Sequence, residues 1–227
     1  MDKEIFKDIE EINNELKEGV EDIKKTFNPL WYVVVLFLVL IIIMWIFPYY
    51  SVKIDPIPNT VPGLDILPVG FDVDFNNITI NSRDDFLKML SYDPVVKRTA
   101  DLVILKSGCQ SNKVCHSKAL FYFVRDNFNY VSDPTTFEYV KTARESILTQ
   151  GGDCDDGSVL LANLLNSIGV TTRFVFVPQH VYVQAKIDDA LNKYKDDGWV
   201  NLDVTCNSCE FGQMSYRYSD VDKFYVG

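Results

Sequence analysis

The chain is poor in basic residues. Its 22 lysines and arginines stand against 32 aspartates and glutamates, which gives a formal net charge of −10 at pH 7. Binding to nucleic acid depends on basic side chains that neutralise phosphates, so this balance argues against a nucleic-acid partner. The sequence also lacks a glycine-rich loop of the spacings that hold phosphates. Histidine and cysteine are scarce, with two and five residues, and the chemistry of the chain has to be sought among them.

A long run without charge extends from Leu30 to Phe47 and is long enough to cross the hydrocarbon core of a bilayer. Aromatic residues lie at both of its ends, as in interfacial belts: Trp31, Tyr32, Trp45, Tyr49 and Tyr50. A buried core helix rarely lacks polar residues over such a length. A cleaved signal peptide does not fit a run that follows a long charged segment. The sequence therefore predicts a single transmembrane helix within residues 30–50.

The lysines around this run bear on its orientation. Lys24 and Lys25 precede it and Lys53 follows it, and acidic residues count little in the positive-inside rule. This excess of one lysine favours a cytoplasmic N-terminus and an extracellular C-terminal domain.

Residues 1–29 predict one charged amphipathic helix. Apolar residues recur at steps of three and four, with one stutter: Ile5, Ile9, Ile12, Leu16, Val20, Ile23 and Phe27. This pattern is typical of a short coiled coil and favours a homo-oligomer formed through residues 5–27. An amphipathic helix that lies on the lipid surface or docks on a partner is the alternative.

Residues 51–81 form a linker rich in proline, which we expect to be extended, as a stalk or packed along the domain. Phe71–Phe75 alternates like a first strand. Asn77-Ile78-Thr79 matches the glycosylation pattern, but an ordinary turn explains it better.

Residues 82–227 predict one domain in which helices come first and strands later. We expect helices from Ser82, around 96–104, at 116–128, from a capping box at Thr142, and from Cys154 to a stop at Gly169. The period then changes from 3.6 to 2, which predicts strands at 173–177, 180–185 and 199–204. This order indicates an α+β domain whose antiparallel sheet packs on the cysteine helix.

The residues with a chemical signature are Cys154, His180 and Asp203. Cys154 lies between a glycine turn and an amphipathic helix, so its thiol is expected to be exposed at the helix N-terminus, where the helix dipole favours a thiolate. His180 opens one strand and Asp203 lies in another, and alternation puts each of them on the polar face of its strand. A cysteine nucleophile, an imidazole base and a carboxylate that orients it are the parts of an acyl-transfer enzyme.

The neighbouring carboxylates work against this arrangement. Asp155 and Asp156 are expected to oppose formation of the thiolate, so the helix dipole and His180 must outweigh them. The oxyanion of the reaction is expected to bind the backbone N–H of Cys154 and one side-chain donor. Tyr130, Gln150 and Gln179 are the candidates for that donor.

From about Phe121 to Thr205 the chain resembles the transglutaminase-like superfamily, whose core is papain-like. The matching residues include Gly152-Asp153-Cys154-x-Asp156, the leucine-rich helix after them, Gly169-Val170 with Arg173, His180, and Trp199 to Asp203. The resemblance implies a nucleophile at Cys154, a base at His180 and an orienting Asp203. The family includes transamidases, peptidases, peptide amidases and members that have lost catalysis.

The chain departs from the family pattern in two places. The interval from Cys154 to His180 is short, which suggests trimmed substrate loops, and Tyr182 stands where tryptophan is frequent. No calcium loop of the EF-hand type is recognisable, so a calcium requirement is not implied.

Four further cysteines remain: Cys109, Cys115, Cys206 and Cys209. They can form two disulfides in three ways, or a structural zinc site in which His116 could take part. An extracellular domain favours disulfides, so no cofactor is expected.

The sequence thus predicts a membrane-anchored cysteine hydrolase or transamidase with a peptide or protein substrate. Hydrolysis is favoured over cross-linking because no amine-binding site is recognisable. The alternatives from other classes are a catalytically inactive peptide-binding or assembly module on the same fold, and a zinc-dependent binding domain in the cytoplasm.

Overall fold

The computed structural model describes Lys17 and residues 29–67, Gly70, 78–133 and 139–227. It divides into two compact units, Met1–Lys53 and Ile54–Gly227. The expected coiled coil (apart from Lys17), the strand at Phe71–Phe75 and the glycosylation site Asn77 lie outside the described residues.

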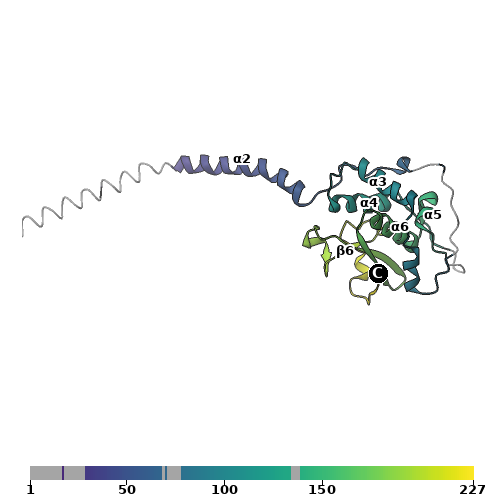
Figure 1. Ribbon diagram of the computed structural model, residues 1–227. Helices are drawn as coiled ribbons and strands as arrows, with labels where there is room; N and C mark the ends of the chain where they lie inside the picture. The colour runs from purple at the N-terminus through teal and green to yellow at the C-terminus, as the bar shows by residue number, and fades with distance from the viewer. Residues whose placement is uncertain (1–16, 18–28, 68–69, 71–77, 134–138) are drawn as a thin grey trace, which may run out of the picture. The chain divides into compact units, whose positions relative to one another are not determined.

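The first unit contains one long apolar helix, α2 (Pro29–Ile54) (Figure 1). Its segment Leu30–Phe47 has a mean hydropathy of 3.0, and none of it is buried. By length and composition this helix is able to cross a membrane, and the same properties suit a signal sequence.

The second unit begins with a strap of residues 55–67 that packs on the domain, one of the two arrangements expected for the proline-rich stretch. The Asn59 N–H donates to the carbonyl of Ser107 at 2.9 Å, and the Asn127 side chain donates to the carbonyl of Pro62 at 3.2 Å. The short helix η1 (Leu64–Ile66) lies in this strap, and Leu64 packs against the main core.

Five helical segments follow: η2 (Arg83–Met89), α3 (Pro94–Lys106), α4 (Lys113–Asn127), α5 (Ala143–Thr149) and α6 (Cys154–Ser167). The capping box at Thr142 and Glu145 forms as expected, with the Thr142 side chain accepting from the Glu145 N–H. The helix expected from Ser82 is a 3₁₀ helix instead. It ends at Met89, shortly before Pro94 opens α3.

The sheet has five strands in the order β5-β6-β4-β3-β7, and each strand is antiparallel to its neighbours. Its strands are β3 (Thr171–Val177), β4 (His180–Lys186), β5 (Lys195–Asp196), β6 (Trp199–Leu202) and β7 (Phe224–Val226). Strands β1 (Asn129–Tyr130) and β2 (Gly151–Gly152) form a separate parallel pair. The sequence predicted β3, β4 and β6, whereas the other four strands have only two or three residues and leave no periodic signal.

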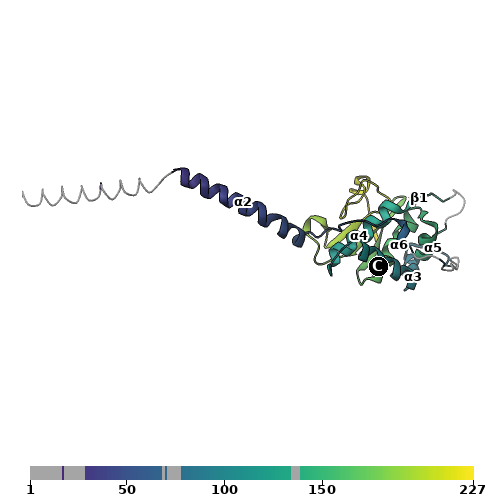
Figure 2. The same ribbon diagram turned by 90° about the horizontal axis from the view of Figure 1, so that it is seen from above.

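Helix α6 is the centre of the domain, with α3, α4 and α5 on one side and the sheet on the other (Figures 1 and 2). Its apolar residues join Val181, Val183 and Ala185 of β4 in the main core. The opposite face of the sheet is covered by the C-terminal segment, where Met214, Tyr218 and Val221 pack against a small second cluster. The α+β architecture expected from the sequence is therefore present.

Candidate active site

Cys154 is the first residue of α6, where the helix leaves backbone N–H groups without an intrahelical partner. The carboxylate of Asp153 caps the helix and accepts from the N–H groups of Asp155 at 3.0 Å and Asp156 at 3.4 Å. The N–H of Cys154 itself has no hydrogen-bond partner in the described part of the chain. This free N–H can bind a developing oxyanion at the sulfur.

Asp156 points into the protein and lies on the inner side of this helix turn. It is fully buried and accepts from both the backbone N–H and the ammonium group of Lys141, at 2.7 and 2.5 Å. A Cβ atom at Gly152 would collide with the Asp156 side chain, which explains the glycine there. Asp156 therefore holds the cysteine loop in place, and its charge is balanced by Lys141.

Two side chains one helical turn apart dock α6 on the first residues of β4. The hydroxyl of Ser158 donates to the carbonyl of Val181 at 3.1 Å, and the backbone N–H of Val181 lies near the sulfur of Cys154, where it lowers the pKa of the thiol. Val181 directly follows His180, so this docking brings the thiol to the strand that carries the histidine.

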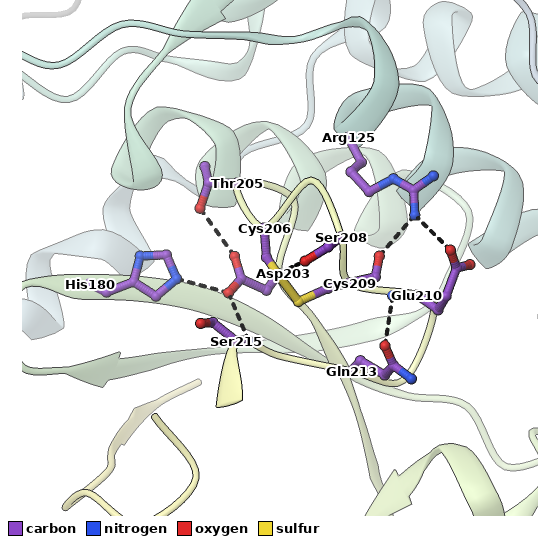
Figure 3. The surroundings of a disulfide bond; sticks show 10 residues. All are labelled: Arg125, His180, Asp203, Thr205, Cys206, Ser208, Cys209, Glu210, Gln213 and Ser215. Carbon is purple, nitrogen blue, oxygen red and sulfur yellow. Dashed lines mark hydrogen bonds and ion pairs between the residues drawn. A yellow bond between two sulfur atoms is a disulfide. The ribbon is translucent and has the colours of Figure 1, made fainter. Parts of the chain in front are cut away.

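His180 and Asp203 form a hydrogen-bonded pair, with 3.0 Å between Nε2 and Oδ2 (Figure 3). Strands β4 and β6 are paired, and Val183 lies opposite Leu202, which makes the two polar positions neighbours. The Asp203 carboxylate also accepts from the Thr205 hydroxyl at 3.1 Å and from the Ser215 N–H at 3.5 Å. Because the carboxylate serves as an acceptor, the neutral tautomer that fits this contact has its proton on Nε2 and a lone pair on Nδ1.

The thiol of Cys154 is protonated in this resting arrangement. Burial raises the pKa of Cys154, and the charges of Asp155 and Asp153 add to it, against the Val181 N–H, so that the pKa rises from 9.0 to about 12. The thiol also donates to Oδ1 of Asp155 at 3.5 Å. No hydrogen bond joins Cys154 to His180 among the described residues. The expectation of an exposed cysteine with a favoured thiolate is therefore corrected, because the sulfur is partly buried beside two carboxylates.

Of the three candidate oxyanion donors, Tyr130 interacts electrostatically with the thiol of Cys154. Burial raises the pKa of the Tyr130 phenol, and Cys154, Asp153 and Tyr218 raise it further. Gln150 lines a small apolar hollow together with Leu64 and other core residues, and Cys154 is not part of that hollow. Gln179 has a positive φ of 60° in the tight turn between β3 and β4.

The four remaining cysteines form two disulfides, Cys109–Cys115 and Cys206–Cys209, with Cα–Cα distances of 5.7 and 5.3 Å. Cys154 is the one free cysteine. His116 hydrogen-bonds through Nε2 to the carbonyl of Gln110 at 2.7 Å. Asp203, Cys206 and Cys209 lie close enough to share a metal ion, but the disulfide leaves the carboxylate as the one strong ligand.

Sequence reasoning missed three residues of the site, Ser158, Ser215 and Tyr218. Tyr218 lies over the imidazole of His180, with ring centroids 4.8 Å apart. Ser158 carried a usable signal, because it is one helical turn from Cys154 on the same helix face. Ser215 and Tyr218 reach the site through a loop, and nothing in their local sequence indicates it.

Comparison with known proteins concerns the core of the domain. Residues 104–204 match the family model of the transglutaminase-like superfamily. No curated protein matches the sequence. The solved structure of Legionella pneumophila LapG is 18% identical, with a TM-score of 0.42, and the match covers 63% of this chain and 81% of LapG. A structure described as a candidate cysteine protease from Cytophaga hutchinsonii is 17% identical, with a TM-score of 0.38. The match covers 56% of this chain and 44% of the chain in that structure.

Proposed function

We propose that the unit Ile54–Gly227, which carries a transglutaminase-like core at residues 104–204, is a cysteine-dependent acyl-transfer enzyme. Its nucleophile is Cys154, its base is His180, and Asp203 orients the imidazole. The observation that carries this proposal is the His180–Asp203 pair at the start of β4, one residue before Val181, whose carbonyl accepts a hydrogen bond from Ser158 on the cysteine helix.

The reaction begins at the carbonyl of a peptide or carboxamide. His180 Nδ1 takes the thiol proton as the sulfur attacks, and the new C–S bond forms a tetrahedral oxyanion. The C–N bond then breaks while the imidazolium returns its proton to the leaving amine, which leaves a thioester on Cys154. Water attacks the thioester, His180 accepts its proton, and the acid product and the thiol are released. An amine in place of water gives transamidation.

The oxyanion is stabilised by the unpaired N–H of Cys154 and by the dipole of α6, with Tyr130 as the proposed side-chain donor. The raised pKa of Tyr130 suits this role because it keeps the phenol protonated as a donor. The resting thiol requires a base for each attack, so His180 acts as a general base here.

The test uses the full chain in detergent with p-nitrophenyl acetate as a generic acyl donor. We expect a burst of p-nitrophenolate and an acetyl group on Cys154 in the mass spectrum. The burst should be absent from Cys154→Ala and slowed on the order of 10²–10⁴-fold in His180→Ala. His116→Ala is the matched control, because this histidine bonds the Gln110 carbonyl and should leave the burst unchanged. Equal bursts in the wild type and in His180→Ala would contradict the proposal of an acyl-transfer enzyme.

A second function is favoured by one observation. The protonated thiol without a hydrogen bond to His180 fits a module that binds peptides in an inactive cleft. Such a module would bind a peptide without acylation of Cys154, and its affinity would be unchanged in Cys154→Ala.

We also propose that α2 anchors the domain to a membrane as a single span, with the N-terminus in the cytoplasm and the domain outside. The helix is apolar over its full candidate span, and the two disulfides suit an oxidising compartment. Protease treatment of intact cells should remove the domain and leave α2 in the membrane fraction. Release of the whole chain by carbonate washing would contradict the anchor.

A further inference from the structure

The chain beyond β6 turns back on the His180–Asp203 pair. The Gly212 N–H donates to the carbonyl of Asn201 at 3.1 Å, and the Ser215 N–H donates to the Asp203 carboxylate. Figure 3 shows this return, with His180 on one side of Asp203 and Ser215 below it. The loop thus starts at the orienting carboxylate and comes back to it.

Two contacts fix the beginning of this loop. The disulfide Cys206–Cys209 closes a turn in which the Cys209 N–H donates to the carbonyl of Cys206 at 2.9 Å. The guanidinium of Arg125 on α4 donates to the carbonyl of Cys209 at 2.8 Å (Figure 3). The turn is therefore joined to the helical side of the domain, and the loop leaves it with a defined direction.

The end of the loop lies on the imidazole. Tyr218 closes the short helix η4 (Tyr216–Tyr218), and its ring is stacked on His180 at 4.8 Å and 15° between planes. Tyr182, two residues from His180 on the same strand, is farther away at 6.3 Å and is fully buried. Tyr216 in the same short helix is 90% exposed, so the two tyrosines of η4 have different environments.

A hydrogen bond through one nitrogen does not by itself fix an imidazole, because the ring can still tilt about the axis through that bond. A second ring stacked on its face restricts the tilt, and it also keeps water from the bond between His180 and Asp203, which strengthens that bond. A base displaced by about 1 Å from its working position loses on the order of 10²-fold in rate.

We propose that Tyr218 is a positioning residue that holds the His180 imidazole in the plane from which Nδ1 reaches the thiol of Cys154. This inference rests on the proposed function. The loop that leaves Asp203, with the disulfide turn at its beginning, carries Tyr218 to this place, so the orienting carboxylate and the stacking ring belong to one continuous segment.

The test compares Tyr218→Phe, Tyr218→Leu and Tyr218→Ala with Tyr216→Ala in the full chain. Two signals are measured, the NMR resonances of ¹³C-labelled histidine and the rate of acylation by p-nitrophenyl acetate. The chain has two histidines, so His116 serves as an internal reference for folding. Tyr218→Leu keeps an apolar side chain against the cluster of Val175, Val177 and Tyr182, which guards against a variant that does not fold.

We expect the ring-current shift of His180 to be lost in the Leu and Ala variants and kept in Tyr218→Phe. Acylation should fall about ten- to a hundredfold in the first two and stay within about twofold of the wild type in Tyr218→Phe and Tyr216→Ala. If the shift is lost but acylation matches that of Tyr216→Ala, the positioning role is wrong while the enzyme stands. If the wild type is not acylated, or His180→Ala is acylated equally, the proposed function itself is wrong.

Discussion

The thiol of Cys154 donates a hydrogen bond to the carboxylate of Asp155, its neighbour in the first turn of α6, with 3.5 Å between Sγ and Oδ1. The helix dipole at this end favours a thiolate, whereas burial and the two adjacent carboxylates favour the thiol. Burial and the carboxylates have the larger effect, because the pKa of Cys154 is raised to about 12 and the thiol stays protonated. The site therefore differs from one with a preformed thiolate and imidazolium.

Asp155→Asn should make Cys154 more reactive. Loss of this charge lowers the pKa of the thiol, so alkylation by iodoacetamide should reach its half-maximal rate at a lower pH than in the wild type, where that pH is about 12. The measurement is the mass of alkylated Cys154 as a function of pH. Asp101→Asn removes a carboxylate paired with Lys97 on the surface and is the control. A profile that Asp155→Asn leaves unmoved would contradict this account of the thiol.

Asp203→Asn should reduce acylation on the order of 10²–10⁴-fold with little change in fold. The amide keeps the size of the carboxylate but can donate to Nε2, which favours the tautomer with a proton on Nδ1 and removes the base. Thr205→Val loses one weaker contact to the same carboxylate and should retain most of the rate. Nitrogen chemical shifts of His180 report the tautomer directly. An unchanged tautomer together with a full acylation rate would remove Asp203 from the site.

The paired change Cys206→Ser and Cys209→Ser should slow acylation, because it opens the turn between Asp203 and the segment that carries Tyr218. Cys109→Ser with Cys115→Ser is the matched control, since that disulfide closes the stretch before and into α4. We expect both pairs to lower the melting temperature but only the first to lower the acylation rate beyond about fivefold. Equal effects of the two pairs would mean that the disulfides act through stability alone.

Asp55→Ala should destabilise the domain strongly. Asp55 accepts from Lys118, from Lys193 at 2.7 Å and from the Tyr194 hydroxyl at 2.6 Å, and the Lys118 side chain is 2% exposed. Loss of the carboxylate leaves a buried cation without its partner, which costs about 3–5 kcal/mol of unfolding free energy. Urea unfolding of the full chain, followed by tryptophan fluorescence, measures this cost. Lys193→Ala, on the exposed side of the cluster, should cost far less.

The same cluster predicts a loss of stability in acid. Burial alone raises the pKa of Asp55, but hydrogen bonds from Lys118, Lys193 and Tyr194 outweigh it and lower the pKa from 3.8 to about 2. Because the pKa of Asp55 is lower in the folded state, the ionised carboxylate stabilises that state at any pH above the pKa of the unfolded chain. This stabilisation is lost as pH falls from about 4 to about 2. The difference in melting temperature between the wild type and Asp55→Asn should narrow over this range. A constant difference would show that the ionised form is not the stabilising one.

Much of the domain could be predicted because its longer elements have strong local signals. The cap at Thr142, the apolar helix from Cys154 and the alternating strand from His180 are determined by near neighbours in the chain. The two- and three-residue strands could not be predicted, since too few residues carry the period. The 3₁₀ helix after Ser82 was expected only as a helix, because helix signals in sequence do not distinguish hydrogen-bond spacing.

The sequence by itself determined the apolar helix, the α+β order of elements, and Cys154, His180 and Asp203 as the candidate chemical groups, since periodicity and spacing are local properties. Tertiary structure alone decided the state of the thiol and the surroundings of the base. Burial raises the pKa of Cys154 beside its chain neighbours Asp155 and Asp153, and Tyr218 reaches His180 through a loop whose first turn is closed by Cys206–Cys209. Burial of the sulfur and the contact of Tyr218 with His180 depend on packing between residues far apart in the chain and on exclusion of water, which a linear pattern does not contain.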